Sequence, residues 1–281
     1  MIDPDFDLDA YLARIGYAGP RAPTLAVLFA LCSAHPAAIP FENIDPLLGH
    51  PPSLRIVDVQ AKLVGAQRGG YCFEHNALLR QALLALGFGV TALAARVVWM
   101  APPGMPTRPR THMLLMVEAE GERYIVDAGF GGHLINVPLR LKATQVQSSP
   151  VSHMRLLPSA DVLTLESRLP DGWAPLYRFT LEPNLPADYE PLNWFTATHP
   201  TSIFRHNLLM ERLTPATRAN LLNDRLTLRA VGEAPRVQRI VSADEFGQVM
   251  REVFGLQLPV PAAELFERVP KGRDAPFVPP L

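Results

Sequence analysis

Apolar residues recur with a helical period along the first ninety residues of the chain. Asp7 and Thr24 are well placed to cap the first two helices, and Gly87 follows the last one. The last of these runs contains no interior Gly or Pro, which strengthens its prediction. The pattern predicts helices over residues 8–15, 25–34, 57–64 and 72–86, the second of them ending before Pro36.

From about residue 90 the period shortens toward two, as it does in strands. Turn signals such as Glu120-Gly121 and Pro158-Ser159 separate the apolar runs. Because strands follow one another without intervening helices, this region is predicted to form an antiparallel barrel or sandwich. The expected strands cover residues 90–100, 111–118, 123–128, 154–157, 162–168 and 173–181.

The last ninety residues combine strand-like and helix-like patterns. Ser242 and Glu245 form a capping box for a helix that ends near Gly255. Proline-rich stretches over 101–110 and after residue 270 are expected to be loops. The remaining features are a hairpin over 225–230 and 236–241, a short helix near 261–269 and an aromatic, hydroxyl-rich stretch over 193–204.

Composition narrows the class of protein. The 281 residues are 48% apolar and 19% charged, as in ordinary globular proteins, and no run approaches the roughly 18 apolar residues that span a membrane. A net charge of −1 gives no electrostatic reason to expect nucleic acid or a membrane surface as partner. The N-terminus lacks the pattern of a signal peptide, and the two cysteines, Cys32 and Cys72, form no C-x-x-C pair. A reducing cytoplasm is therefore expected, without disulfides or structural zinc.

The two cysteines differ in their surroundings. Cys32 lies on the apolar face of its helix and is expected to be core. Cys72 follows Gly69, Gly70 and Tyr71 and begins a helix, where unpaired backbone N–H groups and the helix dipole favour an anion. A thiol in such a first turn is activated as a nucleophile, although most lone cysteines serve packing. Cys72 is therefore a candidate nucleophile that needs a base.

The hairpin predicted over residues 111–127 supplies a base and a group to orient it. With an even-length turn centred near Glu120, His112 and Asp127 fall on one face, either opposite each other or one diagonal apart. Asp127 can then accept a proton from Nδ1–H of His112, which leaves Nε2 to take the thiol proton. Taken singly, a strand histidine and a strand-end aspartate are more often structural. Their combination with Cys72 predicts a Cys–His–Asp triad, and His75 is the weaker alternative base because only Glu74 is near it.

Five ordered blocks resemble the arylamine N-acetyltransferase family. The most specific is Arg68-Gly69-Gly70-Tyr71-Cys72-Phe73-Glu74-His75-Asn76, which is similar to the nucleophile motif of that family. The chain departs from the pattern at Ala128, where the family more often has valine, and the 101–110 loop and the C-terminal tail match no known motif. The other blocks are residues 40–43, 111–113, 126–131 and 193–204.

The resemblance implies a fold and a set of site residues. The fold class would be α+β with a papain-like cysteine enzyme core. It comprises a helical bundle over residues 1–89, an antiparallel β-barrel over 90–190, and an inter-domain segment with an α/β lid over 191–281. The triad would be Cys72, His112 and Asp127. The implied substrate-binding residues are Phe41, Thr111, Phe130, Gly131 and Phe204, of which the three phenylalanines would line the acceptor pocket.

The resemblance also implies a reaction. Acetyl-CoA would act as co-substrate, no cofactor would be tightly bound, and the acetyl group would pass through a cysteine thioester to an arylamine or hydrazine in ping-pong fashion, as in xenobiotic metabolism. The competing interpretations are a cysteine peptidase or transglutaminase-like enzyme, and a binding module that uses the barrel face. A papain-type sequence around the cysteine is absent. Arg68 either pairs with Glu42 at the helix entrance or lies on the surface.

Overall fold

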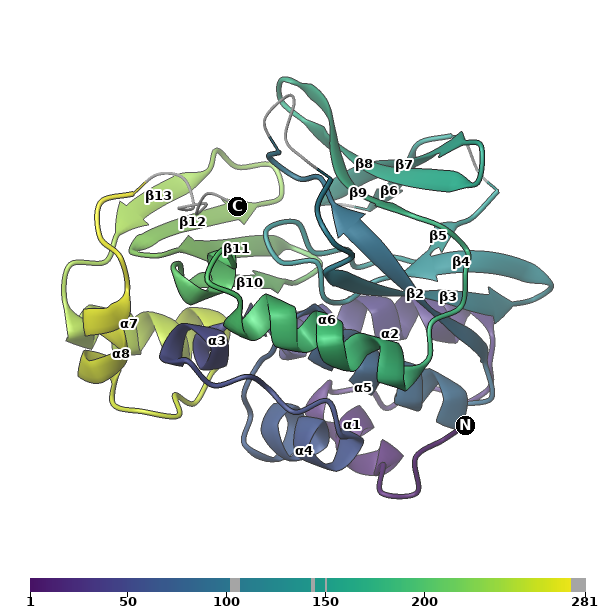
Figure 1. The fold of residues 1–281 in the computed structure, drawn as a ribbon, viewed down its shortest axis with the longest axis horizontal. Helices are drawn as coiled ribbons and strands as arrows, with labels where there is room; N and C mark the ends of the chain where they lie inside the picture. The colour runs from purple at the N-terminus through teal and green to yellow at the C-terminus, as the bar shows by residue number, and fades with distance from the viewer. Residues whose placement is uncertain (102–106, 143–144, 150, 274–281) are drawn as a thin grey trace.

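Helices dominate the first ninety residues of the computed structural model, which describes residues 1–101, 107–142, 145–149 and 151–273 (Figure 1). The central part of the 101–110 loop and the tail from residue 274 lie outside these described residues. The helices pack around α5, and a short strand, β1 (Phe41–Glu42), interrupts them. Their bounds are α1 (Leu8–Arg14), α2 (Leu25–Ala38), α3 (Ile44–Leu48), α4 (Ile56–Gln60) continued by a π-turn (Ala61–Gly65), and α5 (Cys72–Ala85).

The capping residues of the first two helices are confirmed. Asp7 Oδ1 accepts from the Ala10 amide at 3.0 Å, and Thr24 Oγ1 accepts from the Val27 amide at 3.3 Å. The predicted end of the second helix is wrong, because α2 runs through Pro36 to Ala38. Proline removes one backbone hydrogen bond, but burial of the last turn compensates, and the His35 carbonyl still accepts from the Ile39 amide at 2.8 Å.

The middle of the chain forms one antiparallel sheet that curls into a nearly closed barrel, which confirms the predicted architecture. The turn between β3 and β4 has two residues, Glu120 and Gly121, with φ of 51° and 78°, as a type I′ hairpin requires. In order across the sheet the strands are β5 (Leu139–Arg140), β4 (Glu122–Val126), β3 (His112–Ala119), β2 (Gly89–Val97), β9 (Gly172–Phe179), β8 (Val162–Leu169), β7 (Ser152–Ser159) and β6 (Gln147–Ser149).

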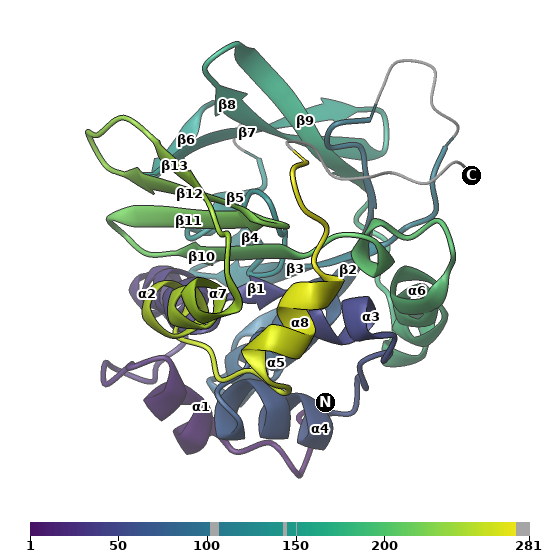
Figure 2. The ribbon, with the colours of Figure 1, turned by 90° about the vertical axis from the view of Figure 1, so that its left-hand side faces the viewer.

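The C-terminal part contains a second antiparallel sheet, which lies beside the barrel (Figures 1 and 2). The predicted hairpin, the Ser242 cap and the last helix are confirmed. Helix α6 (Pro186–Thr198) was not predicted, because its prolines resemble loop signals. The other elements are a 3₁₀ turn (Ile203–Arg205), β10 (Leu209–Leu213), β11 (Thr217–Leu222), β12 (Arg225–Ala230), β13 (Arg236–Arg239), α7 (Ala243–Val249) with a π-turn (Met250–Phe254), and α8 (Ala262–Arg268).

Strand β1 connects the N-terminal helical region to the C-terminal sheet. It forms the edge of the C-terminal sheet, with Phe41 opposite Glu211 and Glu42 opposite Met210 in β10. On its other side Phe41 forms a parallel bridge with Gly70, and the Glu42 amide donates to the Gly70 carbonyl at 2.8 Å. The residues just before the candidate nucleophile are therefore connected through β1 to the C-terminal sheet.

Three buried clusters make the core. The first lies between the helices and the barrel and contains Cys32, which is 4% exposed, as expected for a packing residue. The second fills the barrel, and the third lies between the C-terminal sheet and helices α7 and α8. Within the described ranges, no helix is both long and apolar enough to cross a membrane.

Candidate active site

The three predicted triad residues meet between α5 and the barrel. Cys72 is the first residue of α5, His112 is the first residue of β3, and Asp127 follows the end of β4. His112 Nε2 lies 2.7 Å from Asp127 Oδ2. The Cys72 thiol donates to the Thr111 carbonyl oxygen at 3.7 Å, and Cys72 is close enough to His112 to help raise the pKa of the ring. All three side chains are buried, so the site excludes bulk water.

The hairpin register that brings His112 to Asp127 is confirmed, but the predicted orientation of the ring is wrong. Leu115 pairs with Val126, so His112 and Asp127 lie on one face and one diagonal apart. The nitrogen that faces Asp127 is Nε2 and not Nδ1. Nδ1 is therefore the nitrogen left for the Cys72 thiol. Nε2 is the ring nitrogen farther from the backbone, so it is the one that reaches across the diagonal to the Asp127 carboxylate.

Nearby charges and hydrogen bonds set the pKa values of His112 and Asp127. Burial lowers the pKa of His112, but the negative charge of Asp127 and the hydrogen bonds to Asp127 and Cys72 outweigh it and raise the pKa to about 10. Burial would raise the pKa of Asp127, yet His112, Asn76 and the Gly129 amide hold it below its ordinary value. The His112 imidazole is therefore a cation at neutral pH and lies between the Asp127 carboxylate and the Cys72 residue.

Two further side chains hold Asp127 and were not predicted. Asn76 Nδ2 donates to Asp127 Oδ1 at 3.0 Å and to the Met113 carbonyl at 2.7 Å. Tyr177 OH donates to Asp127 Oδ2 at 2.9 Å, and its ring lies 4.8 Å from that of His112. Asn76 could have been found, because it lies one helical turn after Cys72. Tyr177 gave no local signal, since its strand comes fifty residues later in the chain.

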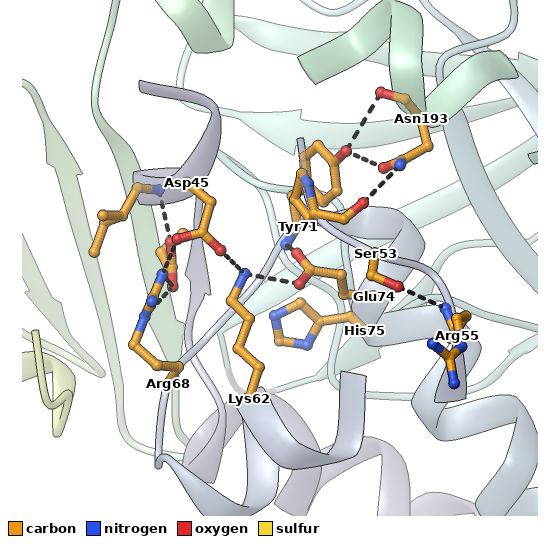
Figure 3. A network of polar contacts seen from close by, with 12 residues as sticks. Asp45, Ser53, Arg55, Lys62, Arg68, Tyr71, Glu74, His75 and Asn193 are labelled. Carbon is orange, nitrogen blue, oxygen red and sulfur yellow. Dashed lines mark hydrogen bonds and ion pairs between the residues drawn. The ribbon is translucent and has the colours of Figure 1, made fainter. Parts of the chain in front are cut away.

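The alternative in which Arg68 pairs with Glu42 is confirmed. Arg68 is 6% exposed, and its Nη2 lies 2.7 Å from Glu42 Oε1 and 2.8 Å from Asp45 Oδ1 (Figure 3). Glu42 belongs to β1 and Asp45 to α3. The buried guanidinium therefore ties the segment before the nucleophile to two neighbouring elements.

A second buried ion pair caps the nucleophile helix itself. The Glu74 carboxylate accepts from the Tyr71 amide at 3.1 Å, which satisfies an unpaired donor at the start of α5. Lys62 Nζ holds Glu74 Oε1 at 2.7 Å and Asp45 Oδ2 at 2.6 Å (Figure 3). The Tyr71 side chain points away from Lys62, and its hydroxyl donates to Asn193 Oδ1 on α6. The first turn of α5 is thereby held from both sides.

Two glycines allow the close approaches that the site requires. A Cβ on Gly129 would lie 2.6 Å from Cys72 Cα, so only glycine lets the end of the hairpin reach the helix. A Cβ on Gly69 would lie 2.1 Å from the Pro40 carbonyl oxygen, so glycine also lets β1 approach the nucleophile segment.

The five predicted substrate-binding residues gather around the same place. Thr111 presents its carbonyl oxygen to Cys72, and the Phe130 ring packs edge-on against His112 with centroids 5.1 Å apart. Phe41 and Phe204 lie 6.2 Å apart. Gly131 lies so close to Phe41 that a Cβ would stand 2.2 Å from the ring.

The geometry disfavours His75 as the base. His75 Nε2–H donates to the Pro40 carbonyl at 3.1 Å, and its Nδ1 accepts from His35 Nε2–H at 2.8 Å. His35 in turn accepts from the Tyr11 hydroxyl at 2.9 Å. Because a carbonyl only accepts, His75 Nε2 carries a proton, and burial lowers the pKa of both rings well below neutral pH, so both are neutral. Neither nitrogen of His75 is free for the thiol.

The His35–His75 pair predicts loss of stability in acid. Burial lowers the pKa of His75 from 6.5 to about 4, so between these values the unfolded chain binds a proton that the folded protein excludes. The free energy of unfolding should fall as pH drops through this window, by about 3 kcal/mol for His75 alone. Urea denaturation at a series of pH values from 7.5 to 4.5 measures this change in the free energy of unfolding. His75→Gln should flatten the slope and His50→Gln, at an exposed site, should not; equal slopes in all three proteins would contradict the assignment.

Comparison with known proteins identifies the family of the chain. A family model described as N-acetyltransferase matches residues 24–263. An arylamine N-acetyltransferase of Mycolicibacterium smegmatis is 41% identical over 255 residues, which are 90% of this chain and 92% of that protein. The solved structure of M. smegmatis arylamine N-acetyltransferase has a TM-score of 0.89 at 39% identity, over 94% of this chain and 98% of that one. The Mycobacterium marinum enzyme in complex with CoA has a TM-score of 0.88 at 38% identity, over 94% and 99%. The chain belongs to the arylamine N-acetyltransferase family.

Proposed function

We propose that this enzyme transfers an acetyl group from acetyl-CoA to an arylamine or hydrazine through a thioester on Cys72. The observation that carries the proposal is the buried Cys72 thiol at the start of α5, beside an imidazole that Asp127 holds. The M. marinum relative solved with CoA supports acetyl-CoA as the donor.

In the first half-reaction Cys72 acts as the nucleophile. Its thiolate attacks the acetyl carbonyl, the bond to the CoA sulfur breaks, and the leaving thiolate takes the proton of the His112 imidazolium. One thioester replaces another, so the step is nearly balanced in free energy and the acetyl-enzyme accumulates. Backbone N–H groups in the first turn of α5 are the oxyanion donors, each worth roughly 3 kcal/mol in other enzymes.

In the second half-reaction His112 acts as the general base. The ring is neutral after it has given its proton to CoA, so it accepts the proton of the attacking amine as the bond to Cys72 breaks. Arylamines are weak bases and remain neutral at pH 7, whereas alkylamines are mostly protonated. The aromatic side chains of Phe41, Phe130 and Phe204 give a ring-shaped acceptor an apolar contact surface, and Thr111 and Gly131 complete the substrate-binding set.

Three regions of the chain have different parts in this reaction, and the chemistry of the thiol indicates a cellular compartment. Residues 1–89 carry the nucleophile, residues 90–190 the base and its partner, and residues 191–281 the inter-domain segment and an α/β lid. We place the enzyme in the cytoplasm, because Cys72 must stay reduced and both cysteines are free thiols.

The acetyl-enzyme is the test of this function. Incubation with acetyl-CoA alone should add one acetyl group to the protein, located at Cys72 by intact-mass and peptide analysis, and an arylamine should then remove it. Initial rates with both substrates varied should give parallel double-reciprocal lines. Intersecting lines would count against a covalent acetyl-enzyme, and a protein that stays unmodified while it cleaves peptides would favour the peptidase interpretation.

A further inference from the structure

A buried ion pair in the C-terminal sheet has no part in the mechanism above. Glu211 on β10 has a fully buried carboxylate, and the Arg218 side chain on β11 is 6% exposed. Arg218 Nη1 lies 2.5 Å from Glu211 Oε1. Leu213 pairs with Arg218 across the two strands, so both charged side chains are on the face shared with Leu213.

This pair binds the loop that follows the catalytic hairpin. We call residues 130–136 the Phe130 loop. The Leu134 amide donates to Glu211 Oε1 at 3.1 Å, and Arg218 Nη2 donates to the Leu134 carbonyl at 3.1 Å. The Gly132 amide also faces the Glu211 carboxylate. The pair therefore satisfies the N–H and the C=O of Leu134, one polar group from each of its two peptide units, and fixes the middle of the loop against β10.

The same loop forms the contacts expected around the acceptor. Its Phe130 packs against His112, and its Gly131 lies against Phe41. Phe41 is also the residue directly opposite Glu211 in the β1–β10 pairing. A shift of the Glu211 side chain would consequently reach Phe41 through the backbone and Phe130 through the loop.

The Glu211–Arg218 ion pair is better suited to orienting the Phe130 loop than to stabilising the fold. A buried ion pair seldom adds net stability over apolar residues of the same volume, because desolvation of both charges offsets their attraction. Here each charge also bonds to the loop backbone, and Arg218 Nη2 donates to Ser152 Oγ on β7 at 2.7 Å. Apolar replacements would preserve the packing and lose these directional bonds.

We propose that Glu211, together with Arg218, is a positioning residue that sets the acceptor pocket by anchoring the Phe130 loop to the C-terminal sheet. This inference rests on the proposed function and deepens it. The acceptors that depend on the anchor are those with an aromatic ring, since under the proposed function that ring would pack against Phe41 and Phe130. The Cys72 thiol, held by α5, does not depend on it.

The test compares a ring acceptor with an acceptor that has no ring. In Glu211→Met/Arg218→Met, kcat/KM for aniline should fall about tenfold, mainly through KM, because a displaced loop misplaces the ring. Transfer to hydrazine, acetylation of Cys72 by acetyl-CoA and alkylation by iodoacetamide should change by less than about twofold. Glu211→Gln, which keeps an acceptor for the Leu134 amide, should show a smaller loss for aniline and provides a second variant if the double one unfolds.

A matched pair on the barrel provides the control. Arg155→Met/Glu166→Met removes another Arg–Glu pair, 2.7 Å apart across β7 and β8, and should leave aniline kinetics unchanged. Equal losses of aniline transfer, hydrazine transfer and Cys72 alkylation in the Glu211 variants would overturn the positioning role. Unchanged aniline kinetics in both Glu211→Met/Arg218→Met and Glu211→Gln would also overturn it. An unacetylated Cys72 in the wild-type protein would instead overturn the proposed function, and the positioning role with it.

Discussion

Replacement of Cys72 by alanine is expected to abolish acetyl transfer, with a loss of at least about 10⁴-fold in kcat/KM for any amine. The thioester has no other atom on which to form, because His112 and Asp127 only move and orient a proton. Acetylation of aniline, followed by chromatography, measures the activity, and intact mass after incubation with acetyl-CoA should show no added acetyl group. Full activity in this variant would refute the proposed function.

The second cysteine is the matched control for this prediction. Cys32 is buried among the helices, and burial raises the pKa of its thiol, so it remains protonated and unreactive. Cys32→Ala should keep full activity and acetylate normally, with a modest loss of thermal stability from the small cavity. An acetyl group found on Cys32 would contradict the assignment of the nucleophile.

Asp127→Asn is expected to keep the fold and lower kcat/KM by about 10³- to 10⁴-fold. The amide removes the negative charge that raises the pKa of His112 to about 10, so that pKa falls and the ring is no longer a cation at neutral pH. The Nε2 side of the ring also loses its charged acceptor. Alkylation of Cys72 by iodoacetamide at pH 6 should slow with it, because the cation beside the thiol is lost.

A distant buried aspartate distinguishes this effect from general damage. Asp224 is 5% exposed and accepts from Arg239 Nη1 and from the Gly272 amide, each at 2.9 Å. Asp224→Asn should lower stability and leave both kcat/KM and the alkylation rate at pH 6 near wild-type values. Unchanged turnover in Asp127→Asn would remove Asp127 from the triad.

The parts of the site that sequence predicts are those set by short-range rules. The Glu120-Gly121 turn determines the register of β3 and β4, and the register places His112 and Asp127 on one face before any tertiary contact is considered. The position of Cys72 at a helix start likewise follows from local periodicity. Alternation along the chain predicted an antiparallel barrel or sandwich, and the family resemblance selected the barrel.

The parts that sequence did not predict depend on contacts between distant segments. Which nitrogen of His112 faces Asp127 is decided by how α5 and β3 pack together, and that is not a property of either segment alone. The hydrogen bond from Tyr177 to Asp127 depends on the pairing of β9 with β2. Strand β1 is two residues long and is a strand only because β10 lies beside it.

Strand β1 has a consequence for how the enzyme is made. On the ribosome the helical segment and its thiol emerge first, and β1 then presents an unpaired edge until β10 leaves the exit tunnel. The Gly70 side of β1 is beside the nucleophile, so the support of the active centre is complete only after most of the chain has been synthesised. A nascent chain thus carries the Cys72 thiol well before the support of the active centre is in place.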